Sequence, residues 1–428
     1  MRLVAGQILL THADPFAVPP AEAMSVRAGA VAIEGGRIRA VGALGDLRAA
    51  HPEAAVDDHG SALVCPGFVD AHVHYPQTAI IASWGERLID WLNRYTFPEE
   101  ARLSDPGYAA EIAGRYLDLA LVHGTTTACS FCTSDPGSVD AFFEAAAARN
   151  MRVAGGKTCM DRNARGALLD TPERAHDESA ALIARWHGAG RASYAITPRF
   201  TPTSSEAQLE ALGALWARNP TCAMQTHLSE QVEEIAWVRA LVPSARDYLD
   251  SYERHGLVGP GALFGHAIHL EDRERARLAE TGSALVHCPT SNTFIGSGLM
   301  DVAARRRDGI AVALGTDTGG GSSFSMLRTM AAAYEIGQLS GTALHPGQLM
   351  WLATAAGADA LRLGDRVGRV APGMEADLAV LDLASTPAIA QAAARAEDPW
   401  QALFATIMMG DDRAVRAVYV AGERVAAP

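Results

Sequence analysis

The chain has 428 residues, and its 36 Lys and Arg residues against 49 Asp and Glu residues give a formal net charge of −13. This acidic balance argues against nucleic acid as a partner, because phosphate contacts need clustered cations. No stretch reaches the roughly 18 apolar residues of a membrane span, and the start of the chain lacks the apolar core of a signal peptide. We therefore expect a cytoplasmic globular protein without a membrane or nucleic-acid partner.

Both ends of the chain are rich in short β-type runs. Residues 31–41 contain two such runs around a Gly-containing turn, which is the signal of a hairpin. Residues 377–381 and 417–425 have the same character near the C-terminus. We expect residues 1–66 and 368–428 to meet in one small β-sandwich domain.

The middle of the chain, residues 67–367, alternates short apolar runs with Ala-rich helical stretches. The runs recur every 35 residues on average between positions 69 and 314, which fits an α/β fold built as a (β/α)₈ barrel. An open doubly wound sheet is the alternative. The eight candidate strands are residues 67–71, 125–129, 152–155, 193–196, 222–225, 262–265, 284–286 and 310–314.

Cysteine and lysine usage add two expectations. The six cysteines are few for this length, so we expect reduced thiols, and the C-x-x-C pair of Cys129 and Cys132 has no second pair with which to build a zinc site. Lys157 is the only lysine beside 35 arginines. It is therefore expected where a guanidinium would not fit, as a cation that supports the fold or the residues of the site without binding the metal or the substrate.

Residue types that bind metals fall at the ends of the predicted strands. His72 and His74 follow the first strand at i, i+2, which turns both imidazoles to one side. His227 ends the fifth strand, His266 ends the sixth, and Asp317 follows the eighth. These are the carboxyl ends, where barrels place their chemistry. The set predicts a metal site, and three imidazoles with one carboxylate suit zinc or iron(II) better than magnesium.

Glu230 lies three residues after His227. If a helix begins there, the i, i+3 spacing places its carboxylate on the face of His227, within reach of a metal-activated water. The alternative is a first-turn carboxylate that only interacts favourably with the helix dipole. Cys288 follows the seventh strand, and we expect it to be a small buried residue rather than a nucleophile.

Several segments together resemble the guanine deaminase family of the amidohydrolase superfamily. The run from Pro66 to His74 resembles the opening metal motif of the superfamily, and the segments after it are more specific to the family. The matching segments are residues 66–74, 75–78, 85–98, 156–163, 198–200, 227–230 and 315–317. They span essentially the whole chain. Thr158 departs from the pattern, since an apolar residue is expected there.

The resemblance implies a (β/α)₈ barrel with a small β domain from both termini, one zinc ion per chain, and hydrolytic release of ammonia from guanine to give xanthine. It also implies a homodimer. His72, His74, His227 and Asp317 match the zinc ligands, and Glu230 matches the proton shuttle. His266 matches the histidine that polarises the reacting centre, with Asp317 assisting it. Gln77, Arg199 and Phe200, together with His227 and Glu230, match positions that contact the substrate.

Three alternatives to this function have to be weighed. The first is that the same metal site deaminates another aminopurine, a cytosine-like base or an aminotriazine. The second is a non-catalytic scaffold, but such a protein would have no reason to keep His72, His74, His227, Glu230 and Asp317 together. Some amidohydrolases hold two metals bridged by a carboxylated lysine from strand four, but that strand is followed by Pro198 and Arg199, and Lys157 follows strand three.

Overall fold

The computed structural model describes residues 1–84 and 87–425. Gly85 and Glu86, which belong to one of the family segments, lie outside the described residues. The chain divides into two compact units, residues 1–70, 118–127 and 324–428 in one and residues 71–117 and 128–323 in the other. The domain boundaries expected at residues 66 and 367 stay a prediction.

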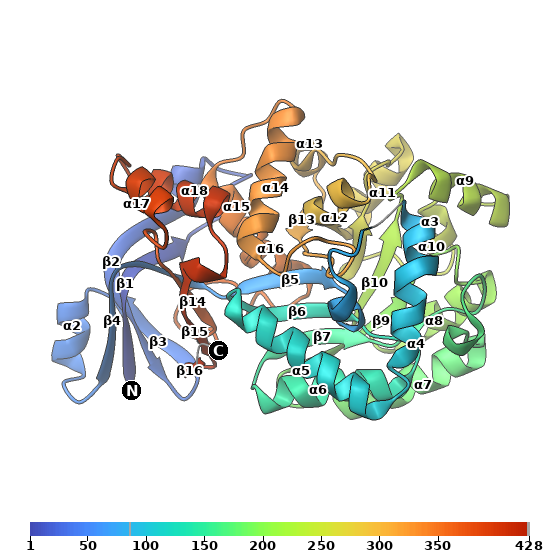
Figure 1. Ribbon diagram of the computed structural model, residues 1–428, viewed down its shortest axis with the longest axis horizontal. Coiled ribbons are helices and arrows are strands. Elements are labelled where there is room, and N and C mark those ends of the chain that lie inside the picture. The colour runs from blue at the N-terminus through green and yellow to red at the C-terminus, as the bar shows by residue number, and fades with distance from the viewer. Residues whose placement is uncertain (85–86, 426–428) are drawn as a thin grey trace. The chain divides into compact units, whose positions relative to one another are not determined.

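All eight predicted barrel strands are present, and their spatial order follows their order in the sequence (Figure 1). This confirms the predicted α/β fold with an eight-stranded parallel near-barrel. Each strand is followed by a helical crossover, which is what brings consecutive parallel strands side by side. The strands are β5 (Phe68–Val73), β6 (Thr125–Phe131), β7 (Arg152–Gly156), β9 (Ala192–Pro198), β10 (Ala223–Leu228), β11 (Ala262–His266), β12 (Ala284–His287) and β13 (Ala311–Leu314), and the short β8 (Thr158–Cys159) pairs with β9.

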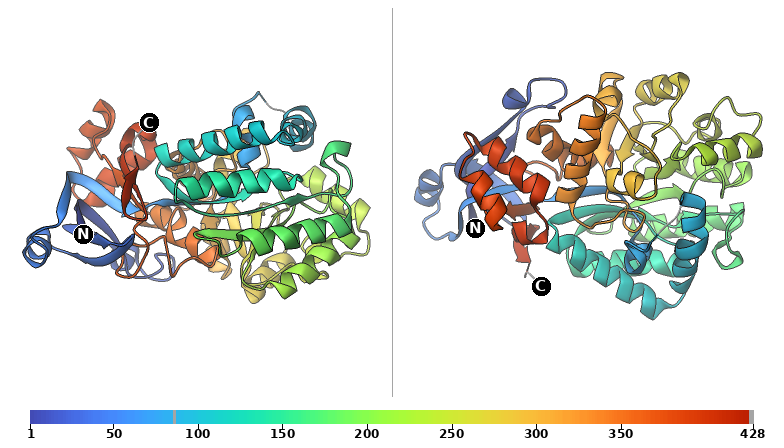
Figure 2. Two further views of the ribbon diagram at one scale, coloured as in Figure 1. Left: turned by 90° about the horizontal axis from the view of Figure 1, so that it is seen from below. Right: turned by 45° about the horizontal axis from the view of Figure 1, so that its top comes forward.

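The barrel strands are almost entirely buried. Every residue of β5, β6, β7, β10 and β12 is buried, which explains why these strands do not show the alternation of apolar and polar residues of a half-exposed strand. Helices α6 (Pro136–Ala148), α7 (Pro172–Trp186) and α8 (Glu206–Arg218) follow one another along the outside of the strands (Figures 1 and 2). Each begins after a residue whose side chain caps a backbone N–H, namely Asp135, Thr171 and Ser205.

The strands at the two ends of the chain form a seven-stranded mixed sheet. Its order is β16 (Glu423–Val425), β15 (Val415–Val420), β14 (Leu378–Leu381), β4 (Ala55–Pro66), β1 (Arg2–Thr11), β2 (Met24–Glu34) and β3 (Arg37–Gly42). The predicted hairpin is β2 and β3, which turn through Gly35 and Gly36 at positive φ. Since β14 pairs with β4, the C-terminal strands join the N-terminal ones in this sheet, as predicted.

The remaining helices connect these strands. None of the helices within the described residues is long and apolar enough to cross a membrane. They are α1 (Pro20–Ala23), α2 (Leu44–Ala50), α3 (Leu88–Trp91), α4 (Phe97–Arg102), α5 (Pro106–Val122), α9 (Val232–Leu241), α10 (Asp250–Glu253), α11 (Asp272–Thr281), α12 (Pro289–Phe294), α13 (Val302–Arg307), α14 (Met326–Leu339), α15 (Pro346–Leu352), α16 (Ala355–Ala360), α17 (Pro387–Ala393) and α18 (Pro399–Met409).

The single lysine is part of a buried ion cluster after β7. The Nζ atom of Lys157 donates a hydrogen bond to Asp170 and lies 3.2 Å from Glu178 Oε2, and the side chain is fully buried. Burial alone would lower the pKa of Lys157, but the surrounding Cys159, Asp170 and Glu178 outweigh it and raise that pKa. A compact ammonium with three donor hydrogens suits this enclosed place between two carboxylates, and its contacts are structural.

Replacing Lys157 with Met tests this ion cluster. The change removes the buried cation of Asp170 and leaves only the exposed Arg174, whose Nε lies 3.7 Å from Asp170 Oδ1, so we expect the free energy of unfolding to fall by about 3–5 kcal/mol. Lys157→Arg keeps the charge but adds bulk, and we expect it to restore only part of that loss. The control is Arg174→Met, because Arg174 contacts the same two carboxylates, Asp170 and Glu178, from an exposed position and should cost no more than about 1 kcal/mol. Urea unfolding of the metal-loaded protein measures all three, and equal losses for Lys157→Met and Arg174→Met would contradict the assignment.

Candidate active site

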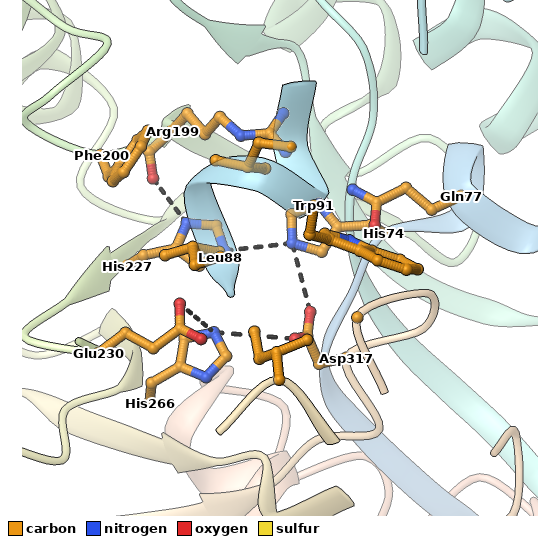
Figure 3. Close-up of a pocket in the computed structure, with 13 residues that line it drawn as sticks. His74, Gln77, Leu88, Trp91, Arg199, Phe200, His227, Glu230, His266 and Asp317 are labelled. Carbon is orange, nitrogen blue, oxygen red and sulfur yellow. Dashed lines mark hydrogen bonds and ion pairs between the residues drawn. The ribbon is translucent and has the colours of Figure 1, made fainter. Parts of the chain in front are cut away.

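Four of the predicted ligands converge at the carboxyl ends of the barrel strands. His72 lies in β5, His74 directly follows β5, His227 lies near the end of β10, and Asp317 follows β13. His74 Nε2 is 3.1 Å from His227 Nε2, and Asp317 Oδ1 is 3.4 Å from the Nε2 atoms of both His72 and His74. Figure 3 shows His74, His227 and Asp317 pointing toward one another.

These separations fit the ligands of one metal ion. Ligand atoms about 2.0–2.1 Å from a tetrahedral ion stand about 3.3 Å apart. The three histidines form a group whose nitrogens all lie within 4.8 Å of one another. His72, His266 and Cys288 form a second such group, but Cys288 is buried and donates to Val286 O at 3.6 Å. We therefore assign the metal site to the three histidines, with Asp317 beside them.

The electrostatics of the site suit metal binding. Burial lowers the pKa of His72, and it lowers the pKa values of His74 and His227 well below the usual range, so these imidazoles are held neutral as ligands must be. Burial would raise the pKa of Asp317, but the His72 side chain and the neighbouring histidines outweigh it and keep the carboxylate ionised. His227 Nδ1 lies 2.7 Å from Arg199 O and can only donate to that carbonyl, which leaves Nε2 free to bind a metal.

The backbone bends sharply where the strands deliver these side chains. Ser229, His266 and Asp317 have positive φ angles of 47°, 65° and 50°. Non-glycine residues rarely adopt this left-handed conformation, and such strain persists only where the surrounding structure enforces it. These are three of the nine non-glycine residues with positive φ in the described part of the chain, and all three lie at or beside the polar side chains of the site.

Glu230 reaches the site from a turn and not from a helix. The expected helix at residue 227 is wrong, because α9 begins at Val232 with Gln231 as its N-cap. The left-handed Ser229 turns the chain after β10, and Glu234 Oε2 accepts from the backbone N–H groups of Glu230 and Gln231 at 2.9 and 3.1 Å. Burial raises the pKa of Glu234 to about 7. The first turn of α9 therefore fixes the loop that carries Glu230.

Glu230 and His266 lie together beside Asp317 (Figure 3). Glu230 Oε2 is 3.6 Å from His266 Nε2, and Ser297 Oγ donates to Glu230 Oε1 at 2.7 Å. Burial raises the pKa of Glu230. Burial would lower the pKa of His266, but Glu230 and Asp317 outweigh it and raise that pKa. Two groups with raised pKa values thus lie next to the predicted metal ligands, and such perturbed groups are typical of functional sites.

A cavity opens onto these groups. The predicted substrate-contacting residues Gln77, Arg199 and Phe200 all line it, as do His74, His227, Glu230, His266 and Asp317. Leu88, Trp91, Leu92 and Ile295 complete an apolar wall. A cavity with one apolar wall and a few polar groups suits a small flat ring with a polar edge.

Sequence reasoning missed three supporting residues. Glu100 accepts hydrogen bonds from Arg199 and Gln77, Asn292 Oδ1 lies 2.8 Å from His266 Nδ1, and Ser297 holds Glu230. Glu100 lies two residues after a family segment that ends at Pro98, and that proximity was its only signal. Asn292 lies in the short helix α12 and Ser297 in the loop after it, and no local pattern predicts that either residue reaches the site.

Comparison with known proteins agrees with this geometry. Residues 63–425 match the model of the amidohydrolase family. A probable guanine deaminase of Deinococcus radiodurans is 44% identical over 430 residues, which covers 99% of this chain and 98% of that protein. The structure of Escherichia coli guanine deaminase superposes with a TM-score of 0.97 at 40% identity, covering 100% of this chain and 99% of that one.

A third relative has a ligand in its active site. The crystal structure of guanine deaminase from C. acetobutylicum with bound guanine superposes with a TM-score of 0.90 at 27% identity, covering 99% of this chain and 100% of that one. The family resemblance of the sequence segments and these full-length matches agree. The chain belongs to the guanine deaminase family of the amidohydrolases.

Proposed function

We propose that this protein is a zinc-dependent guanine deaminase that converts guanine and water to xanthine and ammonia. The observation that carries the proposal is one cavity that joins a three-histidine metal site, the Glu230–His266 pair and the polar end formed by Arg199 and Gln77. The relatives that match nearly the full chain are named as guanine deaminases, and one of them holds guanine.

The proposed cofactor is one zinc ion per chain, held by His72, His74, His227 and Asp317. Three imidazoles and one carboxylate are a ligand set that suits zinc, and iron(II) is the competing metal. Zinc, when bound, supplies a Lewis acid that makes water a nucleophile near neutral pH.

The chain's own residues would then move the protons. Glu230 takes a proton from the attacking water and gives it to a ring nitrogen, while the water oxygen bonds to C2. His266 and Asp317 stabilise the charge that develops as C2 becomes tetrahedral. The second water proton then passes from the C2 hydroxyl to the amino nitrogen, the bond between C2 and that nitrogen breaks as the C2=O bond forms, and ammonia leaves. The raised pKa of Glu230 suits this role, because a carboxyl that titrates closer to neutral pH can both accept and return a proton.

Arg199, Gln77 and Phe200 would select and orient the base. Guanine carries a carbonyl oxygen at C6 where adenine carries an amine, and the guanidinium of Arg199 can only donate. Phe200 offers an apolar surface to the flat ring. The homodimer implied by the resemblance and the cytoplasmic location expected from the sequence stay predictions, and the molar mass in solution tests the first.

A panel of bases tests the substrate and the metal together. We expect ammonia release from guanine and much slower release from adenine, cytosine and ammeline. Metal analysis should give one zinc per chain, and removal by a chelator should abolish the activity until zinc is restored. Faster turnover of another base would transfer the proposal to that substrate, and two ions per chain would contradict the single-metal site.

Glu230→Gln tests the proton shuttle. The amide keeps the size of the side chain and can still hydrogen-bond with Ser297, but it cannot act as a base. We expect turnover to fall by roughly 10²–10⁴, the usual contribution of general acid–base catalysis, with zinc retained. Steady-state kinetics and metal analysis of the same preparation measure both effects. Near-normal turnover would refute the role.

Arg199→Ala tests the recognition of the base. A site built to hydrogen-bond one group rejects an analogue lacking it by about 10⁴–10⁵, because its own buried polar groups go unpaired. Removing the guanidinium should therefore nearly abolish ammonia release from guanine while zinc content stays the same. An unchanged kcat/KM would show that Arg199 does not contact the substrate.

A further inference from the structure

Glu100 lies behind the two residues that would read the substrate edge. It is in α4, it is 1% exposed, and it does not line the cavity. Arg199 Nη1 donates to both of its carboxylate oxygens, at 3.0 and 2.8 Å, and Gln77 Nε2 donates to Oε1 at 2.9 Å. A single buried carboxylate therefore holds side chains that come from two different strand ends.

The acceptor-only chemistry of Glu100 decides how the Gln77 amide is turned. An amide has one donor end and one acceptor end, and a carboxylate can bond only the donor end. The Nε2 end of Gln77 is thus fixed on Glu100, and Oε1 has no protein partner among the described residues. In Figure 3 the amide nitrogen of Gln77 is turned toward Arg199 and the oxygen away from it. Gln77 is left with an acceptor to offer a ligand.

Arg199 is held in the complementary way. Its Nη1 atom is taken up by Glu100, and its side chain lies over the Phe97 ring with Cζ 5.4 Å from the centroid. Its Nε and Nη2 atoms have no partner within the described part of the chain and remain as donors at a cavity-lining residue. The carboxylate also offsets the positive charge of a side chain that is only 3% exposed.

We propose that Glu100 is the positioning residue that orients both side chains, so that Arg199 presents only donors and Gln77 presents an acceptor at this end of the cavity. This rests on the proposed function. The pattern fits a ring edge on which C=O stands next to N–H, as O6 and N1–H do in guanine. Adenine presents the reverse pattern, an acceptor nitrogen next to an amine, so the same arrangement would mismatch at both positions.

Glu100→Gln tests the proposal, because a Gln side chain has the same shape but can accept or donate and no longer dictates how Gln77 is turned. The readouts use guanine and 2-aminopurine, which carries the amine at C2 but lacks the C=O and N–H edge. We expect kcat/KM for guanine to fall about 10–100-fold, mainly through a higher KM, because a loss of this size corresponds to one charge-assisted hydrogen bond. The kcat/KM for 2-aminopurine should change less than about threefold, because this base lacks the edge that would make that bond.

The neighbouring Glu99 provides the matched control. It is also buried, but it accepts from Tyr108 and Arg102 and has no bond to Arg199 or Gln77. Glu99→Gln should leave the ratio of the two kcat/KM values unchanged. Equal losses for guanine and 2-aminopurine in Glu100→Gln would mean a merely structural role and would overturn the proposal, as would an unchanged value for guanine.

Two further measurements separate the role of Glu100 from misfolding of the variant and from the proposed function. Glu100→Asp retains the buried charge, so we expect the fold to be kept. Its side chain is one methylene too short to hold both Arg199 and Gln77, so kcat/KM should fall for guanine and not for 2-aminopurine. Hypoxanthine carries the same C=O and N–H edge but no amine at C2. Its binding to the zinc-loaded protein, measured by calorimetry, therefore tests recognition of that edge without any reaction. If the wild type bound hypoxanthine but did not deaminate guanine, the proposed function would fail, and hypoxanthine binding unchanged in Glu100→Gln would overturn the role of Glu100.

Discussion

The closure of parallel strands around one cavity is the constraint on which the rest of this structure depends. Parallel strands linked by helical crossovers present all their carboxyl ends on the same side. His74, Arg199, His227, His266 and Asp317 stand far apart in the sequence but at or just beyond such ends. Because the strands are buried on both faces, their positions are fixed by packing, and the side chains at their ends inherit that rigidity.

The same burial gives neighbouring groups different protonation states. Neutral histidines and an ionised Asp317 share the metal site, while a few ångströms away Glu230 and His266 have raised pKa values. Desolvation disfavours charge everywhere in the cavity and sets the direction of the pKa shift at His74, His227 and Glu230, whereas neighbouring side chains outweigh it at Asp317 and His266. A water-exposed cluster of the same residues would lack these opposite pKa shifts.

Hydrogen bonds behind the cavity hold the side chains that line it. Glu234 fixes the turn before α9, and Glu100 holds Gln77 and Arg199. Ser297 donates to one carboxylate oxygen of Glu230, and the other oxygen faces His266. Each of these side chains is buried and bonded to a residue that faces the cavity. They orient the groups of the site without contacting a ligand, which is how a scaffold keeps a site preorganised.

The sequence by itself determined the architecture and indicated the candidate residues of the site. The spacing of apolar runs located the eight strands, and metal-binding residue types at their ends indicated the candidate ligands, because both signals are local. The helix expected at Glu230 was wrong, since the choice between helix and turn depended on Ser229 and on the contacts of Glu234. Glu100, Asn292 and Ser297 could not be found for a related reason. Their roles come from contacts between segments distant in the chain, such as Glu100 with Arg199, and only the tertiary structure brings such segments together.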